Sequence, residues 1–298
     1  MWLVLGVCSA LLLGFYDVAK KVSLRANAVI PVLFLSVACS SLLLLPFLVL
    51  SRETAFFQNS LFFVPSVNLQ AHFLIFIKSL LVLSSWLCGY FAMKNLPITL
   101  VSPINATRPM WTLMGALIIF GEQLAVYQWV GTLIALVSFL SFSFVGKKEG
   151  VSFVHNKWIW CIVAATLLGA ASGLYDKYLL RSVNHMAVQV YYTFYQCILM
   201  AIVVGCLWFP QRKKSTPFVW RWSILLISLL LVSSDFFYFY ALSLPDSLIS
   251  VLSTVRRSGV VVPFIYGAVV FHDKNIVLKS ICLLGVLIGM LFLFFNGV

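Results

Sequence analysis

The chain has 298 residues, of which 62% are hydrophobic and only 9% are charged, and its mean hydropathy is +1.06. A soluble domain is about 45–50% apolar and about 25% charged, so the composition excludes a soluble protein and indicates an integral membrane protein. The net charge of +12 does not indicate a nucleic-acid partner, because the basic residues fall at the ends of apolar segments rather than on a folded basic surface.

Apolar runs separated by polar breaks predict ten membrane-spanning helices. In chain order their bounds are 2–19, 29–50, 74–95, 98–120, 126–145, 158–178, 187–209, 222–243, 247–270 and 277–296. We interpret the first segment as a retained span, because it is long and no basic region precedes it as in a signal peptide. The expected units are a five-helix repeat at 1–146, a linker loop at 147–156 and a second five-helix repeat at 157–298.

Two ordered matches between the halves indicate a duplication. Gly-Phe-Tyr-Asp at 14–17 and Gly-Leu-Tyr-Asp at 173–176 each close the first span of a half. Leu96–Pro97 joins the third and fourth spans, and Leu244–Pro245 joins the eighth and ninth. An odd number of spans in each half turns the second half upside down. We therefore expect an all-α fold of two inverted five-helix repeats, which is typical of secondary transporters.

The distribution of Lys and Arg between the loops predicts the orientation. With the N-terminus outside, the cytoplasmic loops hold thirteen Lys and Arg residues, Lys279 among them, and the outer loops hold three. Cytoplasmic loops of membrane proteins carry the excess of basic residues. Both termini are therefore expected outside.

Four of the twenty Lys and Arg residues are not assigned to a loop, namely Lys78, Arg108, Arg256 and Arg257, and Asp235 lies near the middle of the eighth span. A central Arg costs about 2.5–3.5 kcal/mol on insertion scales, and such residues normally face a polar cavity or a partner. Lys78 is the exception, because it lies near the predicted start of its span and is expected to extend to the interface.

Polar and aromatic residues recur at helical spacing on the central spans, which places each set on one helix face. The sets are Ser102, Asn105, Arg108 and Thr112 on the fourth span; Ser250, Thr254, Arg257 and Ser258 on the ninth; Ser228, Asp235 and Tyr238 on the eighth; and Trp86 with Tyr90 on the third. These faces are expected to meet near the midplane of the membrane and to form a substrate cavity.

The central charges favour an anionic ligand. Arg256 and Arg257 are about 100° apart around their helix, so we expect Arg257 to face the cavity and Arg256 to pair with Asp235 or backbone carbonyls. Arg108 is then left for a ligand, and Arg binds carboxylates and phosphates bidentately. The alternative, that these charges only tie helices together, stays open.

The candidate substrate-binding set adds four aromatic residues at central depth, for which core packing is the alternative. The set comprises Arg108, Arg257, Arg256, Asp235, Asn105, Trp86, Tyr90, Tyr238 and Trp111.

Asp17 and Asp176, the acids of the repeated motif, are candidates for gating or ion coupling. Inversion places Asp17 toward the inner face of the membrane and Asp176 toward the outer. The alternative for Asp17 is a surface ion pair with Lys20 or Lys21, one turn further along the helix.

Several motifs carry a family resemblance. The fourth span holds Arg108–Pro109 and is closed by Gly121–Glu122, the fifth holds Gly131, and the ninth contains Leu-Ser-Thr-Val-Arg-Arg-Ser-Gly at 252–259. In these features and in its hairpin pattern the chain resembles the drug/metabolite transporter superfamily, in its EamA-like branch of two five-helix repeats. The ninth span departs from the pattern with His272–Asp273. Glu122 and Asp273 are expected to cap helices or to form loop ion pairs.

The resemblance implies a multi-pass secondary carrier of the inner (cytoplasmic) membrane, with alternating access through a cavity between the repeats. We expect an exporter of a small anionic or zwitterionic metabolite, with Asp235 holding the charge network or carrying a coupling proton, in a monomer or homodimer. A flippase of a lipid-linked substrate is the alternative. An enzyme is not expected, because the four His residues are dispersed. No cofactor or metal is expected, since the seven Cys residues show no CxxC spacing.

Overall fold

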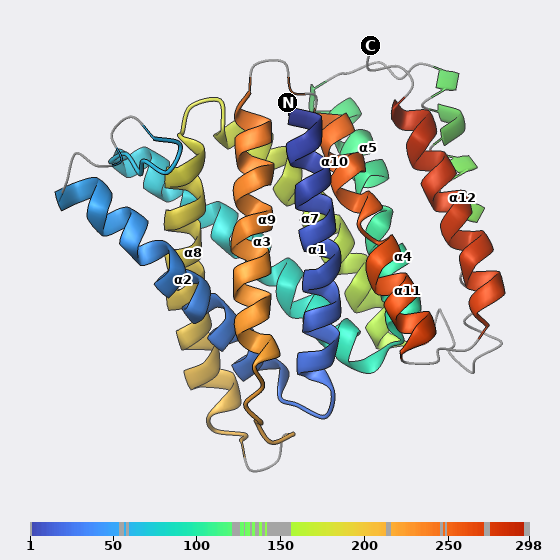
Figure 1. Ribbon diagram of the computed structural model, residues 1–298, viewed down its shortest axis with the longest axis horizontal. Coiled ribbons are helices and arrows are strands. Elements are labelled where there is room, and N and C mark those ends of the chain that lie inside the picture. Colours follow the sequence, from blue (N-terminus) through green and yellow to red (C-terminus); the bar gives the residue numbers. More distant parts are fainter. Residues whose placement is uncertain are drawn as a thin grey trace.

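The computed structural model describes residues 2–53, 57, 60–120, 156–212, 216–244, 247, 249–270 and 275–294, with scattered residues between 126 and 141. The described chain is helical (Figure 1). Its elements are α1 (Trp2–Leu24), α2 (Val29–Glu53), α3 (Leu69–Asn95), α4 (Ile98–Ala106), α5 (Arg108–Phe120), α7 (Lys157–Leu179), α8 (His185–Val203), the π-helical turn η1 (Val204–Trp208), α9 (Ser223–Ser243), α10 (Ile249–Ser258), α11 (Val261–Val269) and α12 (Ile276–Phe294).

Among the described residues, five helical segments are long and apolar enough to cross a membrane. They are Val29–Glu53, Leu69–Asn95, Lys157–Leu179, His185–Trp208 and Ser223–Ser243.

Two predicted features fall largely or wholly where the structure gives no description. The fifth span is represented only by scattered residues, and the linker only by Asn156, whose side chain accepts a hydrogen bond from the Trp158 N–H and so caps α7. Glu122 and Asp273 lie outside the described residues.

The helices at the fourth and ninth predicted spans are broken, which corrects the prediction of continuous helices. α4 ends before Thr107, and α10 ends before Gly259. Pro109 and Pro263 follow these breaks, and each lacks the N–H that would bond the carbonyl four residues earlier. Non-helical backbone at membrane depth is tolerated where protein buries it or where it lines a cavity.

Corresponding helices of the two halves run in opposite directions. In Figure 1, α1 descends while α7 rises, α2 rises while α8 descends, and α3 descends while α9 rises. The packing is reciprocal: α1 packs on α9 as α7 packs on α3, and α2 packs on α9 as α8 packs on α3. The first helix of each half therefore packs against the third helix of the other half.

Serine hydrogen bonds join both of these first-to-third helix contacts. The Ser9 hydroxyl donates to the Ser234 carbonyl at 2.8 Å, and the Ser85 hydroxyl donates to the Ala165 carbonyl at 2.7 Å. Small residues allow the close approach of backbones that is common in membranes. At the neighbouring contact of α1 with the α10–α11 break, a Cβ on Gly259 would overlap the Ala10 carbonyl oxygen.

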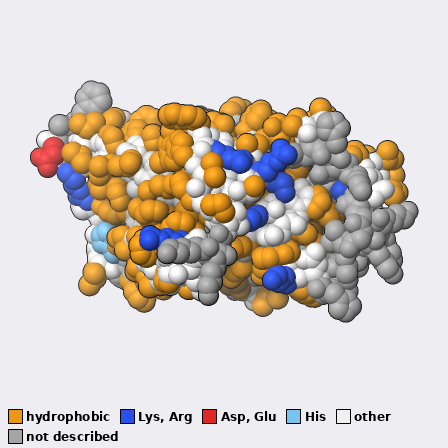
Figure 2. Space-filling model, turned by 90° about the horizontal axis from the view of Figure 1, so that it is seen from below, with side chains coloured by type: hydrophobic (Ala, Val, Ile, Leu, Met, Phe, Trp, Pro, Cys, Tyr) orange, Lys and Arg blue, Asp and Glu red, His pale blue; other side chains and the backbone are white. Residues whose placement is uncertain are grey.

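One end of the bundle is basic. α1 and α3 end there and α7 and α9 begin there (Figure 1), and Figure 2, which views this end, shows Lys and Arg side chains gathered over its middle. The Lys21 ammonium donates to the carbonyls of Met93 and Leu96 at 2.8 and 2.6 Å, and Arg221 donates to the Arg25 carbonyl at 2.7 Å. Basic side chains here therefore also stabilise helix C-termini.

The prediction of the orientation counted Lys279 as a residue of a cytoplasmic loop, and this is wrong. It lies in the first turn of α12, is fully buried, and donates a hydrogen bond to Thr99 Oγ1 at 2.9 Å. α12 packs against α4, and the side chain of Lys279 points into that contact rather than toward the membrane surface.

Candidate functional site

A cavity of about 130 Å³ lies between the two halves. Both broken helix pairs contribute to its wall, because Arg108 begins α5 while Arg256 and Arg257 lie at the end of α10. The cavity is lined by eight of the nine predicted substrate-binding residues and by both candidate gating acids, namely Arg108, Arg257, Arg256, Asp235, Asn105, Trp86, Tyr90, Tyr238, Asp17 and Asp176.

Trp111 is the predicted residue that does not line the cavity. Its indole N–H donates instead to Thr107 Oγ1 at 3.3 Å, one turn earlier in the chain. Thr112 lines the cavity, and Trp111 is about 100° away from it around α5. Helical rotation therefore carries the indole away from the cavity wall.

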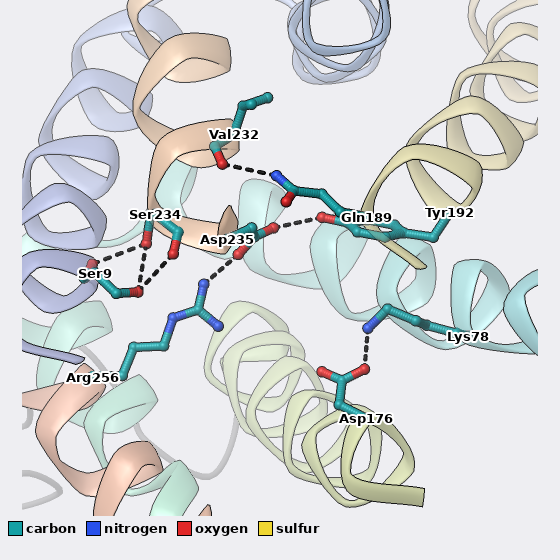
Figure 3. A network of polar contacts seen from close by, with 9 residues as sticks. All are labelled: Ser9, Lys78, Asp176, Gln189, Tyr192, Val232, Ser234, Asp235 and Arg256. Carbon is teal, nitrogen blue, oxygen red and sulfur yellow. Dashed lines mark hydrogen bonds and ion pairs between the residues drawn. The ribbon is translucent and has the colours of Figure 1, made fainter. Parts of the chain in front are cut away.

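Each of the three carboxylates that line the cavity has a cationic partner. Asp17 Oδ1 lies 2.7 Å from Lys20 Nζ on the same helix. Asp176 on α7 pairs with Lys78 on α3 (Figure 3). The third carboxylate, Asp235, pairs with Arg256.

Asp235 is bound from two sides, as Figure 3 shows. Arg256 contacts one carboxylate oxygen, and the Tyr192 hydroxyl donates to the other at 2.5 Å. The guanidinium of Arg256 also lies over the Tyr238 ring, 4.1 Å from its centroid. The expected pairing of Arg256 with Asp235 is present. Arg256 nevertheless lines the cavity together with Arg257, because both side chains are long enough to reach it from their separate positions on α10.

Lys78 does not extend to the membrane interface, which corrects the prediction from its sequence position. Its exposed fraction is 2%, and its ammonium lies over the rings of Tyr192 and Phe239 at 5.0 and 4.9 Å. α3 begins at Leu69, earlier than expected, so Lys78 lies roughly 13 Å inside the helix. Lys78 shares a helix face with Ser85, seven residues on, and that spacing was the available sequence signal for its place in the cavity wall.

The pair between Asp17 and Lys20 is buried rather than on the surface, with exposed fractions of 9% and 7%. The Lys20 ammonium also lies over the rings of Tyr16 and Tyr90, at 4.7 and 5.2 Å from their centroids. The alternative of a solvent-exposed ion pair for Asp17 is therefore wrong. Lys21, the other lysine considered, bonds backbone carbonyls of the α3 C-terminus.

Arg108 and Arg257 have no carboxylate partner among the described residues. Arg108 donates to Asn105 Oδ1 at 3.0 Å, and its buried Nε has no partner in the described part of the chain. A Cβ on Gly169 would overlap the Arg108 guanidinium. The missing side chain at Gly169 therefore lets Arg108 lie directly against α7.

The charge balance of the described cavity wall is positive. It contains five cationic side chains and three carboxylates, which leaves a surplus of two. Holding guanidinium groups away from water without counterions is costly. A bound anion offsets that cost through charge-assisted, bidentate hydrogen bonds.

A helical membrane protein with a charged cavity at the breaks of two discontinuous helices has the architecture of a membrane transporter. The sequence profile of the EamA-like transporter family matches residues 1–144. This match confirms the family resemblance over the first half of the chain, where Arg108–Pro109, Gly121–Glu122 and Gly131 lie.

The similarity in fold extends over nearly the whole chain. A solved structure titled "Crystal structure of protein" aligns with a TM-score of 0.65, covering 98% of this chain and 95% of that one. The two sequences are 13% identical, so this likeness concerns the fold alone. No curated protein matches the chain.

Proposed function

We propose that the protein is a secondary carrier that exports a small anionic or zwitterionic metabolite across the cytoplasmic membrane by alternating access. The observation that carries this proposal is the pair Arg108 and Arg257, which line a buried cavity without a carboxylate partner among the described residues. Arg is the side chain best suited to bidentate binding of carboxylate and phosphate.

The proposed architecture is ten membrane helices in two inverted repeats, at residues 1–146 and 157–298, joined by a linker at 147–156. The opposite directions of corresponding helices and the reciprocal packing of α1 on α9 and of α7 on α3 support it. Each of these contacts joins one helix from each half. Rocking of one half against the other would open the cavity to each side in turn.

The anionic group of the solute is assigned to Arg108 and Arg257, with Asn105 orienting Arg108 through their hydrogen bond. The rings of Trp86, Tyr90 and Tyr238 line the same cavity and are assigned to the apolar part of the solute. Trp111 does not line the cavity and receives no binding role here.

Asp235 is assigned to the coupling step. It is bound by Arg256 and Tyr192 in a wall that the solute also reaches. Displacement of Arg256 by a bound anion would take the cationic partner away from Asp235, so that solute binding and the charge network would be coupled through this residue.

Asp17 and Asp176 are assigned to gating at the two ends of the cavity. In Figure 1, α1 runs downward and Asp17 lies in its second half, whereas α7 runs upward and Asp176 lies near its end. The two acids therefore lie toward opposite ends of the bundle. The basic end of the bundle in Figure 2 is assigned to the cytoplasm by the positive-inside rule. This assignment places the start of α1 outside.

The proposal is tested by exchange transport in proteoliposomes over a panel of metabolites. Arg108→Gln and Arg257→Gln should each reduce binding and transport at least tenfold, which corresponds to about 1.4 kcal/mol of binding free energy. Arg181→Gln is the matched control, because Arg181 is exposed outside the cavity. Transport and binding equal to wild type in both cavity variants would contradict the site assignment.

A flippase of a lipid-linked substrate is the second candidate. It is favoured by an apolar groove of about 500 Å³ between α2 and α9, lined by Leu42, Leu43, Leu225, Leu226 and Leu229 with Cys39 and Ser228. Thermal stabilisation by lipid-linked ligands, and not by soluble ones, would favour this candidate, because a ligand that binds the folded state raises its stability.

A further inference from the structure

We infer that the solute carries two negative charges when it binds, as a dicarboxylate or a phosphate monoester does. This inference rests on the proposed function and specifies the substrate class of the same cavity. It follows from the balance of charges in the cavity wall and from the way in which those charges are paired.

The pairing accounts for three of the five cations in the wall. Lys20, Lys78 and Arg256 each contact one carboxylate, and each also lies over at least one aromatic ring. Their positive charges are thus already compensated within the protein. Arg108 and Arg257 are the cations of the described wall that remain uncompensated.

These two arginines come from different halves of the chain, Arg108 from α5 and Arg257 from α10. Two like charges that face one small cavity repel each other, and the repulsion is strong because little water screens it. A dianion compensates both charges. A monoanion leaves one positive charge uncompensated, and a zwitterion leaves the surplus of two unchanged.

The hydrogen-bond donors are also suited to a compact dianion. Arg108 uses one Nη group on Asn105, and its other N–H groups, with the fork of Arg257, can bind oxygens from two sides of the ligand. The cavity volume of about 130 Å³ favours a small solute. Two terminal carboxylates or one phosphate group would supply the required oxygens, and the two sources can be separated by experiment.

Two pairs of probes with matched shapes and different charges test the inference on the purified full-length protein. Succinate is compared with succinamate, which has one charge fewer. Methyl phosphate is compared with methyl sulfate at pH 8, where a phosphate monoester, with its second pKa near 6, carries about two charges. Affinities are obtained from ligand-induced thermal shifts.

The dianion of at least one pair should bind at least tenfold more tightly than its monoanionic partner. A preference in the first pair alone identifies two separate carboxylates, and a preference in the second identifies a single doubly charged group. Equal affinities within both pairs would overturn the inference while leaving the proposed anion carrier intact.

Asn105→Asp provides a test of the charge count that keeps both arginines. The new carboxylate replaces the amide oxygen that Arg108 already contacts, so the surplus falls from two to one. The affinity ratio of dianion to monoanion should fall at least tenfold. Asn95→Asp is the control, because Asn95 is exposed at the end of α3 and should leave the ratio unchanged.

An unchanged ratio in Asn105→Asp would overturn the inference. Binding of none of the four probes would also overturn it. Failure of the proposed function has a different signature: stabilisation and transport of only neutral or cationic solutes in the metabolite panel, with Arg108→Gln and Arg257→Gln behaving like wild type.

Discussion

The two copies of the Gly-x-Tyr-Asp motif, at 14–17 and 173–176, have the same place in their halves and different surroundings. Asp17 pairs with Lys20 on its own helix, whereas Asp176 pairs with Lys78 from the other half. A pair within one helix persists when helices separate, but a pair between α7 and α3 must break. The second acid therefore couples the two halves in a way that the first does not.

The glycines of the motif differ as well. A Cβ on Gly14 would lie 2.6 Å from the Gly259 carbonyl oxygen and 2.8 Å from Cβ of Val262, whereas nothing lies within 4 Å of a Cβ on Gly173. Gly14 permits close packing of α1 on the broken ninth span, and Gly173 faces the cavity. The duplication thus repeats the helix geometry, while the new neighbours give each copy its own role.

Removal of Lys78 should have the largest effect. Lys78→Met leaves the buried Asp176 carboxylate without its partner and should lower the free energy of unfolding by about 3–5 kcal/mol. Denaturant unfolding of the purified protein measures the loss. The double variant Lys78→Met with Asp176→Asn should recover most of it, because no uncompensated charge remains. A loss below about 1 kcal/mol in the single variant would contradict the role of this pair.

The two motif glycines should respond differently to the same substitution. Gly14→Ala should lower the stability by about 1–3 kcal/mol, because the methyl group meets backbone atoms that cannot easily move. Gly173→Ala should be neutral or stabilising by up to about 1 kcal/mol, since Ala favours the helix. Paired thermal melting curves provide the measurement, and equal shifts would show that the two sites are equivalent.

Lys20→Met should cost about 1–2 kcal/mol, less than the loss of Lys78. Asp17 also lines a small pocket with Arg256 and Arg257, so its carboxylate keeps positive charges nearby when Lys20 is removed. The same unfolding assay, run beside that of Lys78→Met, makes the comparison. A larger loss for Lys20 than for Lys78 would reverse the proposed difference between the two acids.

The motif tyrosine of the second half should have the smallest effect. The Tyr175 hydroxyl donates to the Leu74 carbonyl at 3.1 Å and so joins α7 to α3. Tyr175→Phe should cost about 0.6 kcal/mol, the average for such interhelical bonds in membranes. Tyr178→Phe, which alters an exposed ring on the same helix, is the control and should cause no change. Equal losses of stability in the two variants would show that the hydrogen bond from Tyr175 to Leu74 does not contribute to stability.

Many residues of the candidate site could be predicted from the sequence, because burying a charge in a membrane is costly and charged residues inside apolar spans are therefore rare. Arg108, Arg257 and Asp235 stood out as charges inside apolar spans. Arg256 was expected to pair with Asp235 or with backbone carbonyls, and the structure shows the first of these. Lys78 was misplaced because the start of α3 was predicted too late: Gln70 and His72 are polar, so hydropathy placed the start after them, whereas the helix begins at Leu69, capped by Asn68. The partner of Asp176 depends on the packing of α3 against α7, which hydropathy does not encode.

The helix breaks and the direction of Trp111 were missed for related reasons. Pro109 and Pro263 were visible, but proline is tolerated in membrane helices, and the break depends on how α4 and α10 pack. Trp111 has suitable depth and chemistry, yet a rotation of about 100° from Thr112 takes it away from the cavity. Depth was predictable from the sequence, whereas rotation about the helix axis required the structure.

The proposed binding site is tested most directly by a structure of the protein with a transported anion bound. We expect the anionic group to lie within hydrogen-bonding distance of the guanidinium groups of both Arg108 and Arg257, in the cavity between the two halves. A transported ligand bound elsewhere, with neither arginine in contact with it, would show that the site is wrongly assigned.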